Sequence, residues 1–226
     1  MGNTKHAIKN TSLHPRVANW IYNQHAKGDI RNIIVNEICE SIRVKQSLLN
    51  ERMVSVIYSA AKIIISACRK KRKIVWLGNG GSAADAQHLA CELVSTFEHR
   101  DPIKRKAIRS IALNTNTSIM TAVGNDFSFE YIFERQVEAH IDRGDVVIGL
   151  STSGNSVNVI NALRLASKMG ATTIGFTGKS GGRLRRYADI LIAVPHERTR
   201  LVQEAHMTIG HIICLLVERE LFEQSK

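Results

Sequence analysis

Short apolar runs alternate with longer amphipathic stretches along most of the chain. Runs of four to six residues occupy positions 74–77, 108–113, 146–150, 172–176 and 190–194, and turn-forming or polar residues flank them. Runs that are apolar throughout are typical of strands buried on both faces of a parallel sheet. The stretches between them are long enough for crossover helices. The pattern therefore predicts an α/β fold with a doubly wound, five-stranded parallel sheet flanked by helices.

A helical period precedes the first strand. Between residues 31 and 70 apolar side chains recur three or four positions apart, as from Ile34 to Ile38 and from Val54 to Ile57. This spacing predicts two helices with a break near residue 50, and a similar pattern predicts a closing helix from about residue 200 to 221. Residues 1–30 are polar and mixed. We expect them to form an arm in front of a single domain of residues 31–226.

Composition narrows the class of protein. The chain has 226 residues, of which 44% are hydrophobic, which suits one globular domain. No apolar run approaches the length of about 18 residues that a membrane-spanning helix needs, and the N-terminus lacks the apolar core of a signal peptide. The four cysteines form no CxxC pair and stand in apolar or helical contexts. We expect buried free thiols, as in a protein of the reducing cytoplasm.

The formal net charge is +11, which predicts that anions are attracted to the surface. Basic residues gather at 69–73, 104–106 and 183–186, but aromatic residues make up only 5% and do not interleave with them. A surface on which nucleic-acid bases stack is therefore not indicated. The basic runs fit solvated faces, or attraction of a phosphorylated metabolite.

Small polar residues follow three of the predicted strands, at 78–82, 151–156 and 177–182. Ligands of open α/β sheets bind at the carboxyl ends of the strands, where small side chains let a phosphate approach backbone N–H groups. None of the three loops is a complete GxGxxG or GxxxxGK[ST] motif, which argues against a dinucleotide or a P-loop nucleotide. The sequence Ser-Thr-Ser-Gly-Asn-Ser at 151–156 has more hydroxyls than helix capping requires. It predicts a phosphate-binding loop.

Several separated motifs resemble one family. They are GNGGS at 78–82, QHLACEL at 87–93, VGNDFSF at 123–129, STSGNS at 151–156 and QEAHMTIGH at 203–211. In this order they resemble the phosphoheptose isomerases of the sugar isomerase (SIS) domain family, over about residues 35–221. The resemblance implies a flavodoxin-like fold with two N-terminal helices in its core. It also implies a cytoplasmic homotetramer with active sites at subunit interfaces.

The resemblance further implies interconversion of sedoheptulose 7-phosphate and D-glycero-D-manno-heptose 7-phosphate, a phosphorylated seven-carbon sugar. The product would serve heptose biosynthesis for lipopolysaccharide, another surface glycan or a secondary metabolite. Glu92 and His211 match the family's acid–base pair, and one zinc ion per subunit would be held by His88, Glu92, Gln203 and His211. The implied substrate-binding residues are Asn79, Gly80, Gly81, Ser82, Asn125, Asp126, Ser151, Thr152, Ser153, Ser156 and Gln203.

The residue types agree with this chemistry. An aldose–ketose isomerase moves a proton between C1 and C2 through an enediol, and needs a base, a group near the two oxygens and a phosphate anchor. His88 and Glu92 are four residues apart and share a helical face, from which both can ligate zinc. Without the surrounding motifs, this pair is more typical of a surface hydrogen bond on an amphipathic helix, and the motifs around it reverse that preference. Gln203 and His211 are separated by about 12 Å of helix, and His206 lies between them as a competing residue or a hydrogen-bonded interior histidine.

Two positions depart from the family pattern. Thr96 and Arg200 stand where phosphoheptose isomerases have an arginine and an aspartate, respectively. One alternative is therefore an isomerase of another phosphosugar. A second is a non-catalytic SIS protein that binds the replication initiator, although such proteins lack the acid–base residues retained here. A third is a phosphosugar-sensing transcription regulator, but the first 70 residues are too short for a DNA-binding domain and two helices.

Overall fold

A computed structural model of the chain describes residues 30–99, 101 and 103–223. The chain divides into two units, residues 1–43 and 44–226. Of the first unit, the described part is the beginning of helix α3 (Ile30–Ser47). The arm expected at residues 1–30 falls almost wholly outside the described residues. The division into an arm and a domain of residues 31–226 stays a prediction.

The second unit is built on a five-stranded sheet. Its strands are β1 (Ile74–Gly78), β2 (Ser110–Ala112), β3 (Val146–Leu150), β4 (Thr172–Thr177) and β5 (Ile190–Ala193), all parallel, in the order β2-β1-β3-β4-β5. This order confirms the doubly wound, flavodoxin-like prediction. All five apolar runs form strands, although the run at 108–113 contributes only three residues.

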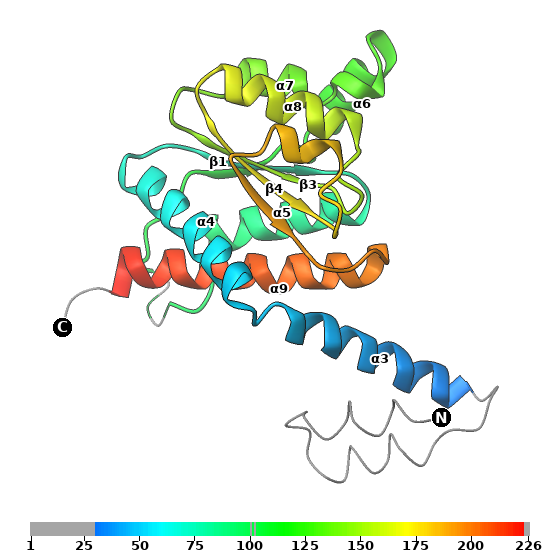
Figure 1. The fold of residues 1–226 in the computed structure, drawn as a ribbon. Coiled ribbons are helices and arrows are strands. Elements are labelled where there is room, and N and C mark those ends of the chain that lie inside the picture. The colour runs from blue at the N-terminus through cyan, green and yellow to red at the C-terminus, as the bar shows by residue number, and fades with distance from the viewer. Residues whose placement is uncertain (1–29, 100, 102, 224–226) are drawn as a thin grey trace. The chain divides into compact units, whose positions relative to one another are not determined.

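Helices cover both faces of the sheet (Figure 1). α4 (Glu51–Arg69), α5 (Gly81–Val94) and α9 (Thr199–Glu218) lie on one face, and α7 (Glu134–His140) and α8 (Val157–Lys168) lie on the other. α6 (Thr117–Asp126) and the short helices Phe129–Tyr131 and Arg183–Arg186 complete the connections, and a π-helical turn, Arg219–Glu223, follows α9. Alternate β1 side chains explain the two layers, since Trp76 packs toward α4, α5 and α9, whereas Val75 and Leu77 face α7 and α8.

The predicted break near residue 50 is a helix cap. The side chain of Asn50 accepts a hydrogen bond of 2.9 Å from the backbone N–H of Met53, and α4 begins at the next residue, Glu51. Asparagine is among the preferred residues at this position because its side chain satisfies a backbone donor that has no partner within the helix. The two helices predicted between residues 31 and 70 are therefore confirmed.

α5 and α9 pack closely because a glycine lies between them. Gly210 of α9 is buried, and a Cβ atom placed there would lie 2.6 Å from both terminal carbons of Leu89 on α5. Leu89 is itself fully buried. The absence of a side chain at Gly210 therefore allows the two helices to approach each other at this point.

The cysteine prediction was partly wrong. Cys214 is buried, but Cys39 and Cys68 are half-buried and Cys91 is exposed, and all four are free thiols. Cys91 follows Ala90 on α5 and points away from the sheet, because a residue's face depends on the helix's rotation rather than on apolar neighbours in sequence. None of the helices in the described residues combines the length and the apolarity needed to span a bilayer.

Leu89→Ala should destabilise the fold strongly. The substitution removes a fully buried side chain between α5 and α9, and truncations of this kind lower the free energy of unfolding by about 2–5 kcal/mol. Denaturant titration followed by circular dichroism measures the loss. Val94→Ala, on the same helix where the side chain is 43% exposed, is the control and should change stability by less than about 1 kcal/mol. Equal losses in the two variants would contradict this account of the packing.

Candidate active site

Two loops meet at the carboxyl edge of the sheet. Asn79, directly after β1, and Asn158, in the first turn of α8, exchange two side-chain hydrogen bonds of 2.8 and 2.9 Å. Gly80 has φ +57°, a left-handed conformation that favours glycine, and it leads directly into α5. The loop after β1 is thereby held against the helix that follows β3, as the parallel topology predicts.

The loop at 151–156, which we call the hydroxyl loop, follows β3 and is partly buried. Ser151 and Ser156 lie with their Oγ atoms 3.0 Å apart, and Ser153 is exposed. Gly154 is buried with φ +67°, and a Cβ there would lie 2.6 Å from the carbonyl carbon of Gly181 in the loop after β4. Ser156 is the N-cap residue of α8, yet its side chain makes no capping hydrogen bond. The loop therefore keeps hydroxyls and a helix N-terminus that are not used for capping.

Three predicted site residues converge between α5 and α9. His88 Nε2 lies 2.8 Å from His211 Nε2 and 3.5 Å from Glu92 Oε1. The two imidazole rings meet edge to face, and the ring of Phe97 lies 5.5 Å from that of His211. The side chain of His88 is 44% exposed and that of Glu92 is 19% exposed, so a ligand can reach them. His88 thus contacts both the Glu92 carboxylate and the His211 imidazole, and groups of these kinds can exchange protons with a bound substrate.

Gln203 lies close by but contacts other residues. Its amide Nε2 donates a 3.4 Å hydrogen bond to Asp85 Oδ1, and its side chain covers Gly81, where any Cβ would displace it. Asp85 is buried, its second oxygen has no partner, and burial raises the pKa of its carboxyl. Sequence reasoning missed Asp85. Its spacing of three and seven residues from His88 and Glu92, which places all three on one helical face, could have identified it.

His206 is an interior residue rather than a ligand. Its ring is fully buried, and its Nε2 lies 3.1 Å from the backbone carbonyl oxygen of Thr177 at the end of β4. Burial lowers the pKa of His206 to about 4, although the Thr177 carbonyl opposes this shift. Of the two alternatives for His206, the structure supports the hydrogen-bonded interior histidine.

Asn125 and Asp126 form no hydrogen bond with the other predicted site residues in the described part of the chain. Both are exposed at the end of α6, where Asn125 Nδ2 donates a hydrogen bond of 2.9 Å to Asp126 Oδ1. Exposed aromatic side chains follow them, since Phe127 is 61% and Phe129 60% exposed.

The donor atoms are of the types that bind zinc, but their spacing in the structure differs from that of zinc ligands. Two imidazoles and a carboxylate are common zinc ligands. Two such nitrogens on a tetrahedral zinc lie about 3.4 Å apart, which exceeds the observed 2.8 Å between His88 and His211. Within residues 30–99, 101 and 103–223, no group of three or more His, Cys, Asp or Glu side chains is arranged to hold a metal ion.

Several buried polar side-chain atoms on different elements have no hydrogen-bond partner. Besides Asp85 Oδ2, they include Asn114 Oδ1 just beyond β2, Thr177 Oγ1 and His206 Nδ1. A buried polar atom normally has a hydrogen-bond partner, so each of these atoms can accept or donate a hydrogen bond to water. Asn114, whose Nδ2 donates a 2.6 Å hydrogen bond to the carbonyl of Gly78, was also not predicted.

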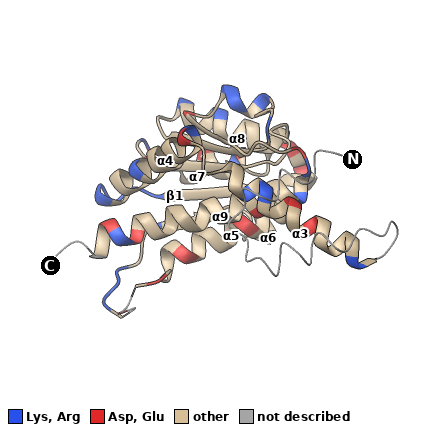
Figure 2. Ribbon diagram, turned by 60° about the horizontal axis from the view of Figure 1, so that its bottom comes forward, with Lys and Arg blue, Asp and Glu red and all other residues tan. Residues whose placement is uncertain are grey.

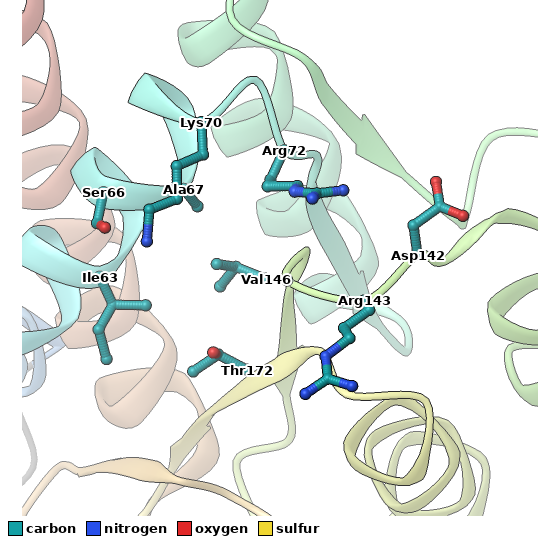
Figure 3. A pocket seen from close by; sticks show the side chains of 10 residues that line it. Ile63, Ser66, Ala67, Lys70, Arg72, Asp142, Arg143, Val146 and Thr172 are labelled. Carbon is teal, nitrogen blue, oxygen red and sulfur yellow. The ribbon is translucent and has the colours of Figure 1, made fainter.

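A hollow lies at the amino edge of the sheet, opposite the edge at which the strands end. Its volume is about 660 Å³, and Figure 3 shows Lys70, Arg72 and Arg143 around it. The lining is basic, because it has these three cations and a single carboxylate, Asp142, which pairs with Lys73. It contains none of the predicted site residues, and open α/β sheets bind their ligands at the other edge. Figure 2 shows Lys and Arg residues on several separate elements of the described part of the chain.

Comparisons with known proteins identify the family of this chain. The family described as SIS domain matches residues 38–178. A phosphoheptose isomerase from Clostridium acetobutylicum is 49% identical over 194 residues, which cover 85% of this chain and 97% of the relative. The chain belongs to the phosphoheptose isomerase family of SIS domain proteins. Among solved family members, the phosphoheptose isomerase from Neisseria gonorrhoeae is 37% identical with a TM-score of 0.77, covering 84% of this chain and 98% of its own.

The fold expected of a phosphoheptose isomerase is also confirmed by a second structure. The Francisella tularensis phosphoheptose isomerase has a TM-score of 0.79 at 31% identity, and the match covers 83% of this chain and 97% of the other. The SIS domain assignment made from five short motifs is therefore correct. The roles of individual residues rest on the geometry described above.

His206 should remain neutral until the pH falls to about 4. Its folded-state pKa lies below the ordinary value of 6.5, so the unfolded chain takes up this proton first. The stability associated with neutral His206 should therefore be present above pH 6.5 and decline between pH 6.5 and about 4. An NMR titration of the ring, assigned by the loss of its signal in His206→Gln, measures the midpoint. A midpoint near 6.5 would contradict the burial of this ring.

Proposed function

We propose that the chain interconverts sedoheptulose 7-phosphate and D-glycero-D-manno-heptose 7-phosphate. The observation that carries the proposal is the contact of His88 with both His211 and Glu92. The 49% identity to a phosphoheptose isomerase supports the choice of reaction. An isomerase needs a proton-transfer pair and a phosphate anchor. The hydroxyl loop lies at the carboxyl edge of the sheet, and the proposed proton-transfer pair lies between α5 and α9.

Glu92 and His211 would carry the proton transfer. One takes the proton from C1 or C2 of the sugar, and the other moves a proton between the two oxygens as the enediol forms and collapses. His88 lies between them and holds His211 through the ring contact of 2.8 Å. Because a carboxylate bound to a metal is a weaker base, Glu92 must be free of tight coordination while it takes up the proton.

The hydroxyl loop would hold the phosphate. The start of α8 supports this role, because the Ser156 hydroxyl caps no backbone N–H and contacts the Ser151 hydroxyl instead, which leaves both hydroxyls beside the helix N-terminus. The loop after β1 and Gln203 would line the sugar chain. Asn125 and Asp126, which are exposed on α6, would reach a sugar only across a subunit interface. The proposed phosphate and sugar contacts are Ser151, Thr152, Ser153, Ser156, Asn79, Gly80, Gly81, Ser82, Gln203, Asn125 and Asp126.

One zinc ion per subunit is part of the proposal. His88, Glu92 and His211 would hold it, and Gln203 would be the weakest donor because its amide now contacts Asp85. Such an ion supplies a Lewis acid that polarises a sugar oxygen.

We also propose a homotetramer in the cytoplasm, with active sites between subunits. Exposed apolar side chains on α4 support an interface, since Val54 is 52% and Tyr58 56% exposed on one helical face. Four free cysteines agree with a reducing compartment. The product would enter heptose synthesis for lipopolysaccharide or another glycan.

A second candidate is isomerisation of a different phosphosugar. The observation that favours it is the changed charge near Gln203, since Arg200 occupies the first turn of α9 where the family pattern has an aspartate. The proton-transfer pair and the hydroxyl loop would serve either sugar. Direct comparison of candidate phosphosugars as substrates separates the two.

Glu92→Gln and His211→Ala should each abolish turnover while the fold is kept. Each removes a group that exchanges the substrate proton, and loss of a general acid or base lowers kcat by about 10²–10⁴-fold. NMR of sedoheptulose 7-phosphate mixed with each protein shows whether aldoheptose 7-phosphate signals appear. Glu204→Gln and His140→Ala, which change exposed residues of the same types, are the controls. Near wild-type turnover in either site variant would remove that residue from the mechanism.

Zinc should bind at about one ion per chain. His88→Ala should lower the zinc content because it removes an imidazole in contact with both other ligands. Elemental analysis by mass spectrometry measures the stoichiometry, and NMR turnover assays before and after chelation show whether activity needs the ion. A chain that carries no zinc and retains full activity would contradict this part of the proposal.

A further inference from the structure

A buried arginine closes the end of the helix that carries His88 and Glu92. Arg105 comes from the segment between α5 and β2, and its side chain is 0% exposed. Its Nη1 donates to the carbonyl of Leu93 at 2.6 Å, and its Nη2 donates to the carbonyl of Glu92 at 3.4 Å. The last carbonyls of a helix lack partners within it, and a cation there also complements the helix dipole. The backbone of Glu92 is thus held by Arg105.

The same guanidinium binds a buried carboxylate from the other helix of the site. Arg105 Nε donates to Glu218 Oε2 at 3.1 Å, and the side chain of Glu218, the last residue of α9, is only 2% exposed. Backbone N–H groups of Phe97 and Glu98 donate to the same carboxylate at 2.9 and 2.6 Å. Burial alone would raise the pKa of Glu218, but these hydrogen bonds and the arginine outweigh it and leave the pKa below its ordinary value. The carboxylate is therefore charged in the folded protein.

The network reaches both members of the proposed acid–base pair. Glu218 lies seven residues after His211, two turns along the same face of α9. Phe97 connects them by a second route, because its N–H binds Glu218 while its ring contacts the ring of His211. Arg105 joins this group to the backbone of Glu92. One ion pair thus spans the two helices that the proton transfer requires.

The ion pair also accounts for a departure from the family pattern. Thr96 occupies the place of an arginine, and its hydroxyl donates to Glu218 Oε2 at 3.3 Å. Arg105 Nε donates to the same oxygen. The short side chain at position 96 thus contacts the carboxylate together with a guanidinium supplied from nine residues further along the chain.

Stability is a poor explanation for such a pair. Taking both charges out of water offsets most of their attraction, and apolar replacement of a buried ion pair often leaves stability unchanged or raised. The pair instead constrains geometry, because its several hydrogen bonds are all satisfied only at one register of α5 against α9. Small errors in the placement of a proton-transfer pair lower the reaction rate strongly.

We propose that Arg105 and Glu218 are a positioning pair, which sets the register of α5 against α9 and thereby the placement of Glu92 and His211. Neither residue touches substrate. The inference rests on the proposed function of Glu92 and His211. Its structural half, the placement of the two rings and the carboxylate, can be measured without turnover.

The test uses the full-length protein with Glu218→Gln, Arg105→Met and the double variant Arg105→Met/Glu218→Met. We expect kcat to fall by about ten- to a hundredfold with KM within about twofold of wild type. We also expect the NMR contact between the rings of Phe97 and His211 to weaken. Glu218→Asp, which keeps the charge, should recover part of kcat. Arg69→Met, which breaks an exposed ion pair with Glu220 beyond the same end of α9, is the control and should leave kcat unchanged.

The double variant keeps the test decisive if a single variant fails to fold, because it leaves no unpaired buried charge. A folded double variant with wild-type kcat and an unchanged Phe97–His211 contact would overturn the proposal. The proposal would also be overturned if kcat fell in proportion to the loss of thermal stability across the variants and Glu218→Asp recovered none of it. If the wild type shows no isomerase activity, the proposed function fails, and the ring contact alone still decides whether the pair positions the helices.

Discussion

The close approach of α5 to α9 is the constraint on which the site depends. Gly210 lies against Leu89, and the helices meet without a side chain between them at that point. This contact allows the His88 ring to reach the ring of His211, 123 residues away in sequence. A wider separation would leave an exposed surface pair on α5 and a lone histidine on α9. The chemistry therefore depends on a packing detail of the hydrophobic layer beneath it.

Two kinds of interaction support that contact from opposite ends. Toward the sheet's carboxyl edge, Gln203 of α9 lies against Gly81 and Asp85 at the start of α5. Toward the other end, Arg105 and Glu218 join the last turns of the same helices. Burial of the apolar layer stabilises the packing but is not directional, whereas the polar contacts specify geometry. Together they hold two helices in one register, with His88, Glu92 and His211 between the polar contacts.

The hydroxyl loop is placed by a separate part of the structure. The parallel sheet brings the ends of β1, β3 and β4 to one edge, and Gly154 allows the loop after β3 to pack on Gly181 after β4. A phosphate anchored there and a proton-transfer pair between α5 and α9 would act on opposite ends of one extended sugar.

The sequence by itself determined the elements and the local pairs. Apolar runs predicted all five strands, and the period of 3.6 residues placed His88 and Glu92 on one face, because both signals depend only on neighbouring positions. The tertiary structure decided the long-range contacts: His88 with His211, Arg105 with Glu218, and Gln203 with Asp85 instead of the histidines. It also decided that Cys91 is exposed and that Asn125 and Asp126 bond to each other on the exposed end of α6. These outcomes depend on how each helix is rotated and how closely it approaches its neighbour, which side-chain packing sets and no spacing along the chain encodes.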